Sequence, residues 1–423
     1  MQHIILHLDM NSYFASVEQQ ANPFLRNKPV GVCAYLPRTQ PFASGRMRGL
    51  SANGCIIASS IEAKKLGIKT AFRVNQARKI CPSIILIEND PNKYRTVASR
   101  LFRIMSGYSA AFEPYSIDEA FLDLTGPAKD FSQAATIAAE IRQRIKQELG
   151  SWLKCAIGIS YTKFLAKFCS DTAAVDQTKI FQNTDSFEEL YRAAKLTDAW
   201  GIGYRLAKRL NDLGIDSLLA LKNRNPQNLI QALGRPGYFL WAKVNGLEIE
   251  HFKTGKELLS KSIGHSYCLP KKTTDKKYLS AILFKLVEKI GRRLRAHNQT
   301  AHGIYLHWSY EVKYEPFGKS FKLKSPVFST EEIFQEVNEI LQRTELIGRV
   351  GMLAVSVFSL SPLVNQLSIF PLKDYGLVRA VDKINSRYGD QSVYRGKLWQ
   401  TAKFARDRIG FRKLDGLFYQ LPD

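Results

Sequence analysis

Ser116-Ile117-Asp118-Glu119-Ala120 places two adjacent carboxylates at a turn between two apolar runs, residues 111–117 and 120–124. A third carboxylate, Asp9, follows the apolar run at residues 4–8. If both regions form neighbouring strands of one sheet, the three acids converge. Three carboxylates at one point repel each other unless cations bind there. The stretch therefore predicts a metal site, although each acid taken alone also fits a turn or a helix cap.

The chain is strongly basic. Its 423 residues include 61 Lys and Arg against 38 Asp and Glu, a formal net charge of +23. Such an excess favours polyanions through phosphate contacts and counterion release, although some soluble proteins are simply basic. Together with the acids, and in a chain long enough for about two to four domains, it indicates metal-dependent chemistry on a phosphate-containing polymer.

Six cysteines are present, and none forms a C-x-x-C pair, so the sequence offers neither a zinc ribbon nor that redox motif. This usage is typical of a reducing, intracellular setting. The N-terminus does not resemble a signal peptide, and no apolar run approaches the roughly 18 residues that span a membrane. We therefore expect a soluble cytoplasmic protein, associated with the nucleoid and not with a membrane.

Strand-like and helix-like patterns alternate up to about residue 195. They predict an α+β arrangement around a mainly antiparallel sheet. Strands are expected at 4–8, 29–35, 84–88 and 153–160, and helices at 11–20, 61–66, 93–106, 132–149 and 162–172. Residues 36–54 are rich in Pro, Gly, Ser and Arg, which predicts a loop or a mobile hairpin.

Residues 196–247 change character. Trp200-Gly201-Ile202-Gly203 lies between two short helical segments, a pattern typical of a helix-hairpin-helix. The glycines permit a tight turn whose amides can face a phosphate. Lys208 and Arg209 follow on the second helix. These features favour a DNA-backbone contact, with an ordinary helical hairpin as the alternative.

A second α+β pattern begins after residues 248–262, which are predicted to be a linker. Residues 263–360 have the order βαββαβ, which predicts a compact four-stranded sheet with two helices. A helix at 330–343 has Ser329 or Thr330 as its expected cap. The tail at 361–423 alternates aromatic and basic residues without a readable pattern.

The residue types suit transfer of a nucleotidyl group to a growing chain. That chemistry needs charge neutralisation and in-line positioning, commonly by two divalent ions about 4 Å apart. Mg²⁺, with Mn²⁺ as the alternative ion, prefers the carboxylate oxygens that Asp9, Asp118 and Glu119 supply. A helix that begins near Asn11 points free N–H groups at the same place, a cradle for a triphosphate. Tyr13 and Phe14 then lie near the sugar, or pack as ordinary core residues.

These motifs resemble those of the Y-family, translesion DNA polymerases. Residues 9–18 resemble the first motif of that family, and residues 116–121 match its second acidic motif. Gly158-Ile159-Ser160 with Lys163, Ala166 and Lys167 resembles the next motif. Residues 200–203 match the thumb hairpin, and residues 261–264 resemble the start of the little finger. The resemblance spans about residues 1–360, in the family's order.

The resemblance implies a polymerase right hand, an α+β multidomain fold. Its palm would comprise residues 1–28 and 83–195, and its fingers residues 29–82. A helical thumb at 196–247 and a linker at 248–262 would follow. The remainder would be a βαββαβ little finger at 263–360 and a C-terminal tail at 361–423.

The resemblance also assigns roles to single residues. Metal binding falls to Asp9, the Met10 carbonyl, Asp118 and Glu119, with the three acids catalytic and Glu119 beside the primer end. Phe14 takes the steric-gate position, where its ring excludes a ribose 2′-OH. Nucleotide contacts are expected from Asn11, Ser12, Tyr13, Phe14 and Lys64. DNA contacts are expected from Lys163, Lys167, Gly201, Gly203, Lys208, Arg209 and Lys261.

Within the family, the fingers segment at 53–67 and the tail segment at 381–389 resemble the UmuC branch, the catalytic subunits of bacterial DNA polymerase V. That likeness implies a processed UmuD dimer and a recombinase filament as candidate partners.

Three departures from the family pattern concern the triphosphate. Ile61 and Lys64 stand where many members place a Tyr and an Arg, and Lys64 lacks the bidentate fork of Arg. The usual Lys-Pro-Asn-Gly is replaced by residues 173–177, which contain no lysine; Lys179 lies nearby. The loop at 37–54, with Arg38, Arg46 and Arg48, is longer than usual. We therefore expect weak nucleotide binding, with a raised KM.

Gln366-Leu367-Ser368-Ile369-Phe370 resembles the bacterial sliding-clamp-binding pentapeptide. Its apolar side chains would fill a pocket on the clamp while Gln366 binds at the edge. A short tail strand is the alternative.

The sequence therefore predicts a low-fidelity, distributive DNA polymerase that extends a primer on a template from deoxynucleoside triphosphates. Two alternatives stay open. The first is a catalytically weak DNA-binding scaffold that recruits other polymerases, which Ile61 and the missing lysine favour. The second is a nucleotide cyclase on a similar palm, which the thumb hairpin, the little finger and the net charge disfavour.

Overall fold

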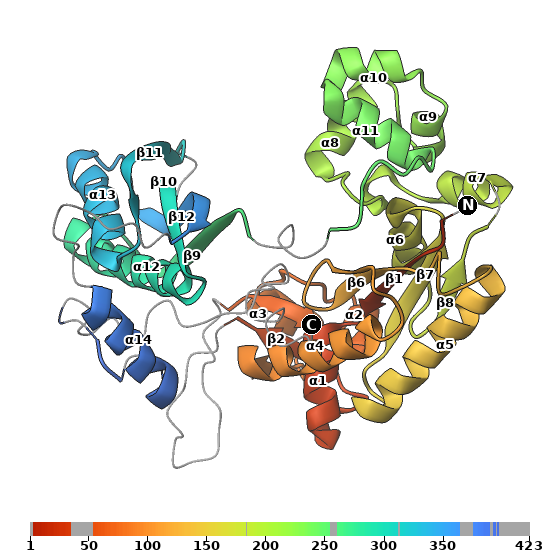
Figure 1. Cartoon of the computed structure of the whole chain (residues 1–423), viewed down its shortest axis with the longest axis horizontal. Coiled ribbons are helices and arrows are strands. Elements are labelled where there is room, and N and C mark those ends of the chain that lie inside the picture. Colours follow the sequence, from red (N-terminus) through yellow and green to blue (C-terminus); the bar gives the residue numbers. More distant parts are fainter. Residues whose placement is uncertain are drawn as a thin grey trace. The chain divides into compact units, whose positions relative to one another are not determined.

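The computed structural model describes residues 3–34, 54–182, 184–253, 260–311, 314–363, 375–389, 392–394 and 396. The described residues form two compact units, one reaching to Lys253 and the other starting at Ser260 (Figure 1). The boundary falls inside the stretch predicted to be a linker. In the part of the chain that the structure describes, no helix is long and apolar enough to cross a membrane.

A five-stranded sheet lies at the centre of the first unit. Its strand order is β5-β6-β1-β7-β8, and every neighbouring pair is antiparallel except β7 and β8. The predicted α+β fold around a mainly antiparallel sheet is confirmed. The strands are β1 (Ile5–Met10), β5 (Phe112–Pro114), β6 (Glu119–Asp123), β7 (Cys155–Ser160) and β8 (Thr178–Ile180).

Successive side chains of β1 point to opposite faces of the sheet. Leu6, Leu8 and Met10 enter the main core, which is shared with α1 (Tyr13–Ala21), α4 (Pro91–Ser106) and α5 (Phe131–Glu148). Ile5 and His7 face the other way, toward α6 (Lys163–Thr172), which lies on the opposite side of the sheet from α4 and α5 (Figure 1). The acids of β1 and β6 lie on the α6 side.

Glycine lets α6 approach this face closely. A Cβ at Gly158 of β7 would lie 2.0 Å from the Ala166 carbonyl oxygen and 2.4 Å from the Ser170 nitrogen, both on α6. No other residue fits between the helix and the strand at that distance. Because Gly158 is the register partner of His7, the close approach brings α6 directly over His7.

A small three-stranded sheet takes two strands from the segment predicted to be the fingers and one, β4, from the segment predicted to be the palm. Its order is β3-β2-β4, with β2 and β3 antiparallel and β2 and β4 parallel. Residues 35–53, most of the predicted loop, lie outside the described residues, and so do Arg38, Arg46 and Arg48. The elements are η1 (Pro23–Leu25), β2 (Val30–Cys33), β3 (Ile56–Ser59), α2 (Ile61–Lys65), α3 (Val74–Ile80) and β4 (Ile85–Glu88).

Short helices follow the sheet. They share a core with the apolar face of α6, through Phe164 and Phe168. The predicted hairpin turn is present: Gly201 has a φ of 94°, a left-handed conformation that glycine adopts without strain. The elements are α7 (Thr184–Ala193), η2 (Leu196–Asp198), α8 (Tyr204–Asp212), α9 (Leu218–Lys222), α10 (Pro226–Leu233) and α11 (Arg235–Val244).

The second unit has the predicted βαββαβ order. Its four strands are all antiparallel, in the order β11-β10-β12-β9, and share one core with the two helices. Ser329 and Glu332 form the capping box at the start of the second helix. The elements are β9 (Ser262–Thr273), α12 (Lys276–Ala296), β10 (Gln299–Tyr310), β11 (Phe317–Val327), α13 (Thr330–Arg343) and β12 (Val350–Pro362).

A further helix, α14 (Tyr375–Tyr388), belongs to the second unit. The guanidinium of Arg295 on α12 binds both carboxylate oxygens of Asp382, at 2.5 and 3.1 Å. Arg292 also donates to Ser386 at 3.3 Å. The tail that had no readable pattern in the sequence therefore contains a helix joined to this unit by polar contacts.

Candidate active site

The strand register brings the predicted acids together. Asp9 on β1 and Glu119 on β6 are direct register partners. Asp118 immediately precedes β6, and its carbonyl accepts a hydrogen bond of 3.0 Å from the Met10 amide. The Ser116 hydroxyl donates to Asp118 Oδ1 at 2.5 Å. The hairpin that carries the two adjacent acids is thus fixed against the end of β1.

Burial and mutual repulsion perturb two of these acids. Burial, opposed by the hydrogen bond from Ser116 and aided by the charge of Glu119, raises the pKa of Asp118 to about 6. Burial and the charges of Asp118 and Glu119 raise the pKa of Asp9 well above its usual value. The pKa of Asp9 is raised even though 34 % of its side chain is exposed. Both carboxylates would therefore gain from an added cation.

The pKa of Glu119 is lowered, in contrast to those of Asp9 and Asp118. Burial alone would raise its pKa, but the contacts with His7 and Lys167 outweigh burial and lower the pKa to about 2. The Lys167 ammonium is the closer partner, 2.7 Å from Oε2 against 3.4 Å for His7 Nε2. We therefore attribute most of the lowering to Lys167. Glu119 is ionised over the whole range in which proteins are active.

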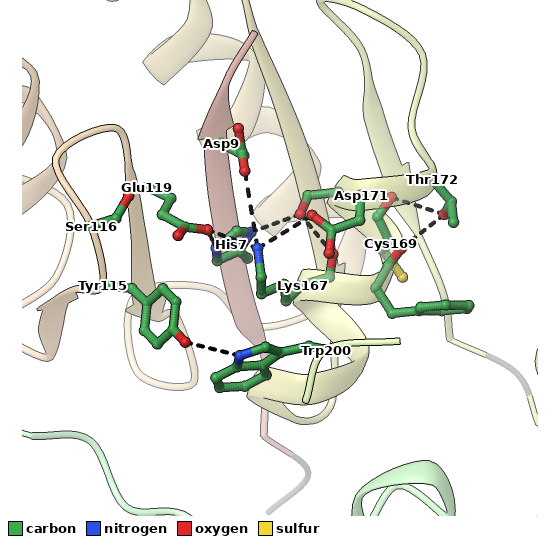
Figure 2. Close-up of polar contacts among 12 residues, drawn as sticks. His7, Asp9, Tyr115, Ser116, Glu119, Lys167, Cys169, Asp171, Thr172 and Trp200 are labelled. Carbon is green, nitrogen blue, oxygen red and sulfur yellow. Dashed lines mark hydrogen bonds and ion pairs between the residues drawn. The ribbon is translucent and has the colours of Figure 1, made fainter. Parts of the chain in front are cut away.

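Lys167 of α6 places its ammonium among the acids (Figure 2). Besides Glu119, its Nζ lies 3.2 Å from Asp171 Oδ1 and 4.0 Å from Asp9 Oδ2. Burial alone would lower the pKa of Lys167, but Asp171, Glu119 and Asp9 together raise it. These ion pairs speak against a DNA contact by Lys167, because its ammonium is already bound by carboxylates.

His7 is a member of the site that the sequence analysis did not single out. It is fully buried, and its Nδ1 lies 2.7 Å from Ser170 Oγ on α6. Burial lowers the pKa of His7, so the ring is neutral. The available signal was a polar residue inside an apolar strand, two positions before Asp9 and hence on the same face.

The donor set suits a hard divalent ion. Within the described residues, no three acidic or imidazole groups are already close enough to form a metal centre. Lys167 supplies the positive charge there instead. Asp9, Asp118 and Glu119 nevertheless offer only oxygen donors. The raised pKa values of Asp9 and Asp118 show that their negative charges are not fully compensated by the protein, so a bound cation would stabilise them. The residues present therefore fit Mg²⁺ or Mn²⁺.

The start of α1 lies beside the acids. The amides of the first turn of a helix have no partner within the helix, and Tyr13 and Phe14 belong to that turn. Ser12 precedes it with a φ of 53°. Asn11 is engaged elsewhere: its amide donates to the Lys154 carbonyl and its side chain accepts from the Asp176 amide. These contacts speak against a direct nucleotide contact by Asn11.

The aromatic pair at 13 and 14 is buried. The Tyr13 hydroxyl donates to the Tyr94 carbonyl at 2.7 Å, and the Phe14 ring stacks on the Tyr94 ring with centroids 4.5 Å apart. Phe14 is 0 % exposed. Tyr13 thus packs as a core residue, and the Phe14 ring is buried against Tyr94.

The predicted triphosphate contacts differ in exposure. Lys64 is exposed on α2, and Ile61 begins the same helix. Ala174 is exposed, whereas Lys179 donates to the Thr172 hydroxyl at 3.0 Å. Apart from Lys64, none of these four positions presents an exposed cation in the structure.

Lys163 is buried, whereas the sequence analysis expected it at the DNA surface. Its side chain is 3 % exposed, and its ammonium lies 2.6 Å from Glu113 Oε2 of β5 and 2.7 Å from the His251 carbonyl. The same Glu113 oxygen accepts from the Lys253 amide at 2.9 Å. Burial and pairing of this ammonium speak against a DNA contact by the Lys163 side chain. Lys163 instead ties the start of the linker to the palm.

The remaining expected DNA contacts are at the surface. Gly201 and Gly203 have open space where a Cβ would lie, and Lys208, Arg209 and Lys261 are exposed. Arg209 also donates to the Ala232 carbonyl at 3.3 Å. The pentapeptide at 366–370 lies outside the described residues.

Two family models match the chain. Residues 8–171 match the impB/mucB/samB family, and residues 260–368 match the C-terminal domain of the same family. The DNA polymerase IV of Acetivibrio thermocellus is 30 % identical over 409 residues, which cover 95 % of this chain and 98 % of that protein. The chain belongs to the Y-family DNA polymerases. It is thus a DNA polymerase with a palm, fingers and a C-terminal little finger.

Two further similarities agree with this assignment. The DNA polymerase IV 1 of Bacillus subtilis is 28 % identical over 402 residues, 93 % of this chain and 92 % of that protein. A solved Y-family DNA polymerase chimera of Dbh and Dpo4 superposes with a TM-score of 0.73 at 25 % identity, covering 85 % of this polymerase and 99 % of that chain.

The narrower likeness to UmuC is not supported by these relatives, since both curated proteins bear the name DNA polymerase IV. The segments that suggested UmuC are short, at 53–67 and 381–389, whereas the likeness to polymerase IV runs along almost the whole chain.

Proposed function

We propose that this polymerase extends a primer on a template by nucleotidyl transfer, in which the primer 3′-OH attacks the α-phosphate of a deoxynucleoside triphosphate and pyrophosphate leaves. The observation that carries the proposal is the convergence of Asp9, Asp118 and Glu119 at one end of the β1–β6 pair. We further propose that synthesis is of low fidelity and distributive, as suits bypass of damaged templates.

The three acids act as the ligand set. Two divalent ions, when bound, would neutralise the triphosphate and the attacking oxygen and orient them in line. Asp9, the Met10 carbonyl and Asp118 would hold one ion, which would neutralise charge on the triphosphate. Glu119 completes the set beside the primer end. Lys167 pairs with Asp171 at 3.2 Å and with Glu119 Oε2 at 2.7 Å, which leaves Glu119 Oε1 for a metal ion.

The start of α1 serves the nucleotide. The Tyr13 and Phe14 amides bind phosphate oxygens at the positive end of the helix dipole, and Ser12 shapes the turn before them. The Phe14 ring excludes a 2′-OH because Tyr94 supports it from behind and leaves it no room to retreat. Lys64 adds one exposed charge. With Ile61 and Ala174 at the other usual contact positions, the KM for nucleotide is raised.

Primer-template DNA binds the thumb hairpin through the amides at Gly201 and Gly203 and the exposed cations Lys208 and Arg209. Lys261, at the start of the second unit, also contacts the DNA.

The pentapeptide at 366–370 binds a sliding clamp. A UmuD-like dimer and a recombinase filament are candidate partners if the chain belongs to the UmuC branch. Extension that requires either partner would favour the UmuC branch.

One experiment tests this function. The polymerase is given a primed template, all four deoxynucleoside triphosphates and Mg²⁺ or Mn²⁺, beside Asp118→Asn. We expect extension by the natural chain alone and none by the variant, with DNA binding unchanged. Extension by Asp118→Asn at the natural rate would contradict the metal assignment. If the natural chain binds DNA but extends nothing in either metal, the scaffold that recruits other polymerases is the better description.

A further inference from the structure

A buried histidine lies against the acid that ends the metal ligand set. His7 of β1 and Glu119 of β6 are both on the α6 face of the sheet, and His7 Nε2 lies 3.4 Å from Glu119 Oε2 (Figure 2). His7 is 0 % exposed. Among the described residues, Nε2 has no hydrogen-bond partner at closer range. A buried imidazole nitrogen aimed at a carboxylate and at nothing else needs an explanation.

The other nitrogen of His7 is held by α6. Ser170 Oγ lies 2.7 Å from Nδ1, and the same hydroxyl lies 2.8 Å from the Lys167 carbonyl. Ser170 reaches the ring because Gly158, the register partner of His7, lets the helix pack against the strand. The Phe121 ring, 4.4 Å from the imidazole between centroids, covers another side. The imidazole is therefore fixed in place by contacts on three sides.

The carboxylate of Glu119 decides which nitrogen carries the proton, because the Ser170 hydroxyl can either donate to Nδ1 or accept from it. A neutral imidazole has one N–H and one bare nitrogen. If Nδ1 carried the proton, the lone pair of Nε2 would face the ionised carboxylate of Glu119, which is repulsive. If Nε2 carries it, the N–H faces the carboxylate, and Ser170 can donate to Nδ1 in place of the Lys167 carbonyl. The second arrangement satisfies both nitrogens.

We propose that His7 is a positioning residue for the catalytic metal site. With its ring held by Ser170 and its Nε2–H tautomer favoured by the facing carboxylate, it directs an N–H to Glu119 Oε2 and, together with Lys167, leaves Oε1 for the metal. Two donors on one carboxylate oxygen restrict the rotation of the Glu119 side chain. Groups that orient a ligand in this way commonly contribute 10- to 100-fold to metal affinity or activity. The inference rests on the proposed role of Glu119 as a metal ligand.

Three variants separate orientation from packing. His7→Phe keeps a ring against Phe121 and removes both nitrogens. His7→Gln keeps an N–H donor without the ring. Ser170→Ala keeps His7 and removes the hydroxyl that holds Nδ1. Ser160→Ala is the matched control, because Ser160 is also a fully buried serine with one hydrogen bond, to the Phe181 carbonyl, away from the acids.

The primary readout is Mn²⁺ binding without chemistry. Full-length protein is mixed with a primer-template whose primer ends in a dideoxynucleotide and with the matching deoxynucleoside triphosphate, and free Mn²⁺ is measured by electron paramagnetic resonance. We expect His7→Phe to weaken binding by at least about 10-fold and Ser170→Ala by several-fold. His7→Gln should recover affinity to within about threefold of the natural chain, and Ser160→Ala should leave it unchanged.

Thermal unfolding of each variant completes the test. If His7→Phe lowers the unfolding midpoint and leaves the Mn²⁺ dissociation constant within twofold, His7 is only a core residue and the inference is wrong. If Ser170→Ala has no effect on Mn²⁺ while His7→Phe does, the part assigned to Ser170 is wrong. Asp118→Asn is run alongside. Should it bind Mn²⁺ as the natural chain does, the metal site itself is misplaced and the proposed function fails; loss in Asp118→Asn with no change in His7→Phe overturns the inference alone.

Discussion

Asp118 is a carboxylate placed where its charge is disfavoured until a cation arrives. It is 9 % exposed, and Glu119 adds a like charge beside it. A raised pKa in the folded state means that the native protein binds the proton more tightly than the unfolded chain does. In the metal-free protein, the ionised carboxylate therefore lowers the free energy of unfolding, and the full effect is present above pH 6.

Asp118→Asn should stabilise the metal-free protein. At pH 7.5 in EDTA, calorimetry should show a larger free energy of unfolding for the variant, by on the order of 2 kcal/mol. Since the pKa of Asp118 is raised to about 6, the natural chain gains stability as the pH falls through 6 toward 4, and the difference should shrink. Asp130→Asn, at an exposed helix cap, serves as the control. A less stable Asp118→Asn at pH 7.5 would refute this account.

Phe14 is expected to act through its rigidity. Because its ring is buried against Tyr94, Phe14→Ala should open space for a 2′-OH and reduce the discrimination against ribonucleotides by on the order of 100-fold, the scale on which a pocket separates substrates by size. The measurement is kcat/KM for a ribonucleotide and for the matching deoxynucleotide. Tyr13→Phe, which loses only the bond to the Tyr94 carbonyl, is the control. Unchanged sugar selection in Phe14→Ala would remove Phe14 from the gate position.

Among the elements, α6 contacts the sheet, the helical segment that follows it and the start of the linker. It supplies Lys167 to Glu119 and Ser170 to His7, and its Phe164 and Phe168 enter the core of the helical segment. Its first residue, Lys163, holds Glu113 of β5 and the His251 carbonyl of the linker. One helix thus joins the catalytic sheet, the thumb and the start of the linker.

Breaking the buried pair should loosen this junction. Glu113→Gln leaves the Lys163 ammonium buried without a counter-charge, so the free energy of unfolding of this unit should fall by about 3–5 kcal/mol. Proteolysis near residue 253 should also become faster, because Glu113 binds the Lys253 amide. The control is Glu148→Gln, in an exposed pair with Arg144, where we expect less than about 1 kcal/mol. Equal effects of the two variants on stability would contradict the anchoring role.

At the scale of the whole molecule, charge governs DNA binding. The net charge of +23 implies that the association constant falls steeply with salt, as counterions are released from the DNA. Lys208→Gln with Arg209→Gln should reduce the slope of log K against log salt by about 2, close to 0.9 for each lost phosphate contact. Fluorescence anisotropy at about 50 to 200 mM salt measures this slope. Arg343→Gln, exposed and paired with Glu339 on α13, is the control. An unchanged slope would remove the thumb hairpin from the DNA interface.

Much of the fold was accessible from sequence patterns. Alternation along residues 4–10, the adjacent acids at 118 and 119, and the Gly-Ile-Gly turn are local signals, and the structure has strands and a turn at those places. The βαββαβ order of the second unit also follows from local periodicity. Lys163 and Lys167 illustrate the limit: both were expected at DNA, and both are bound by carboxylates far away in the chain.

The sequence by itself determined which elements form and which acids end the strands, because hydrophobic periodicity and turn chemistry act over a few residues. Only the tertiary structure decided which charges are satisfied internally. Glu113 and Lys163 lie 50 positions apart, and His7 and Ser170 lie 163 apart. Burial and pairing of a side chain depend on such distant partners, and they separate a lysine that binds DNA from one that holds the protein together.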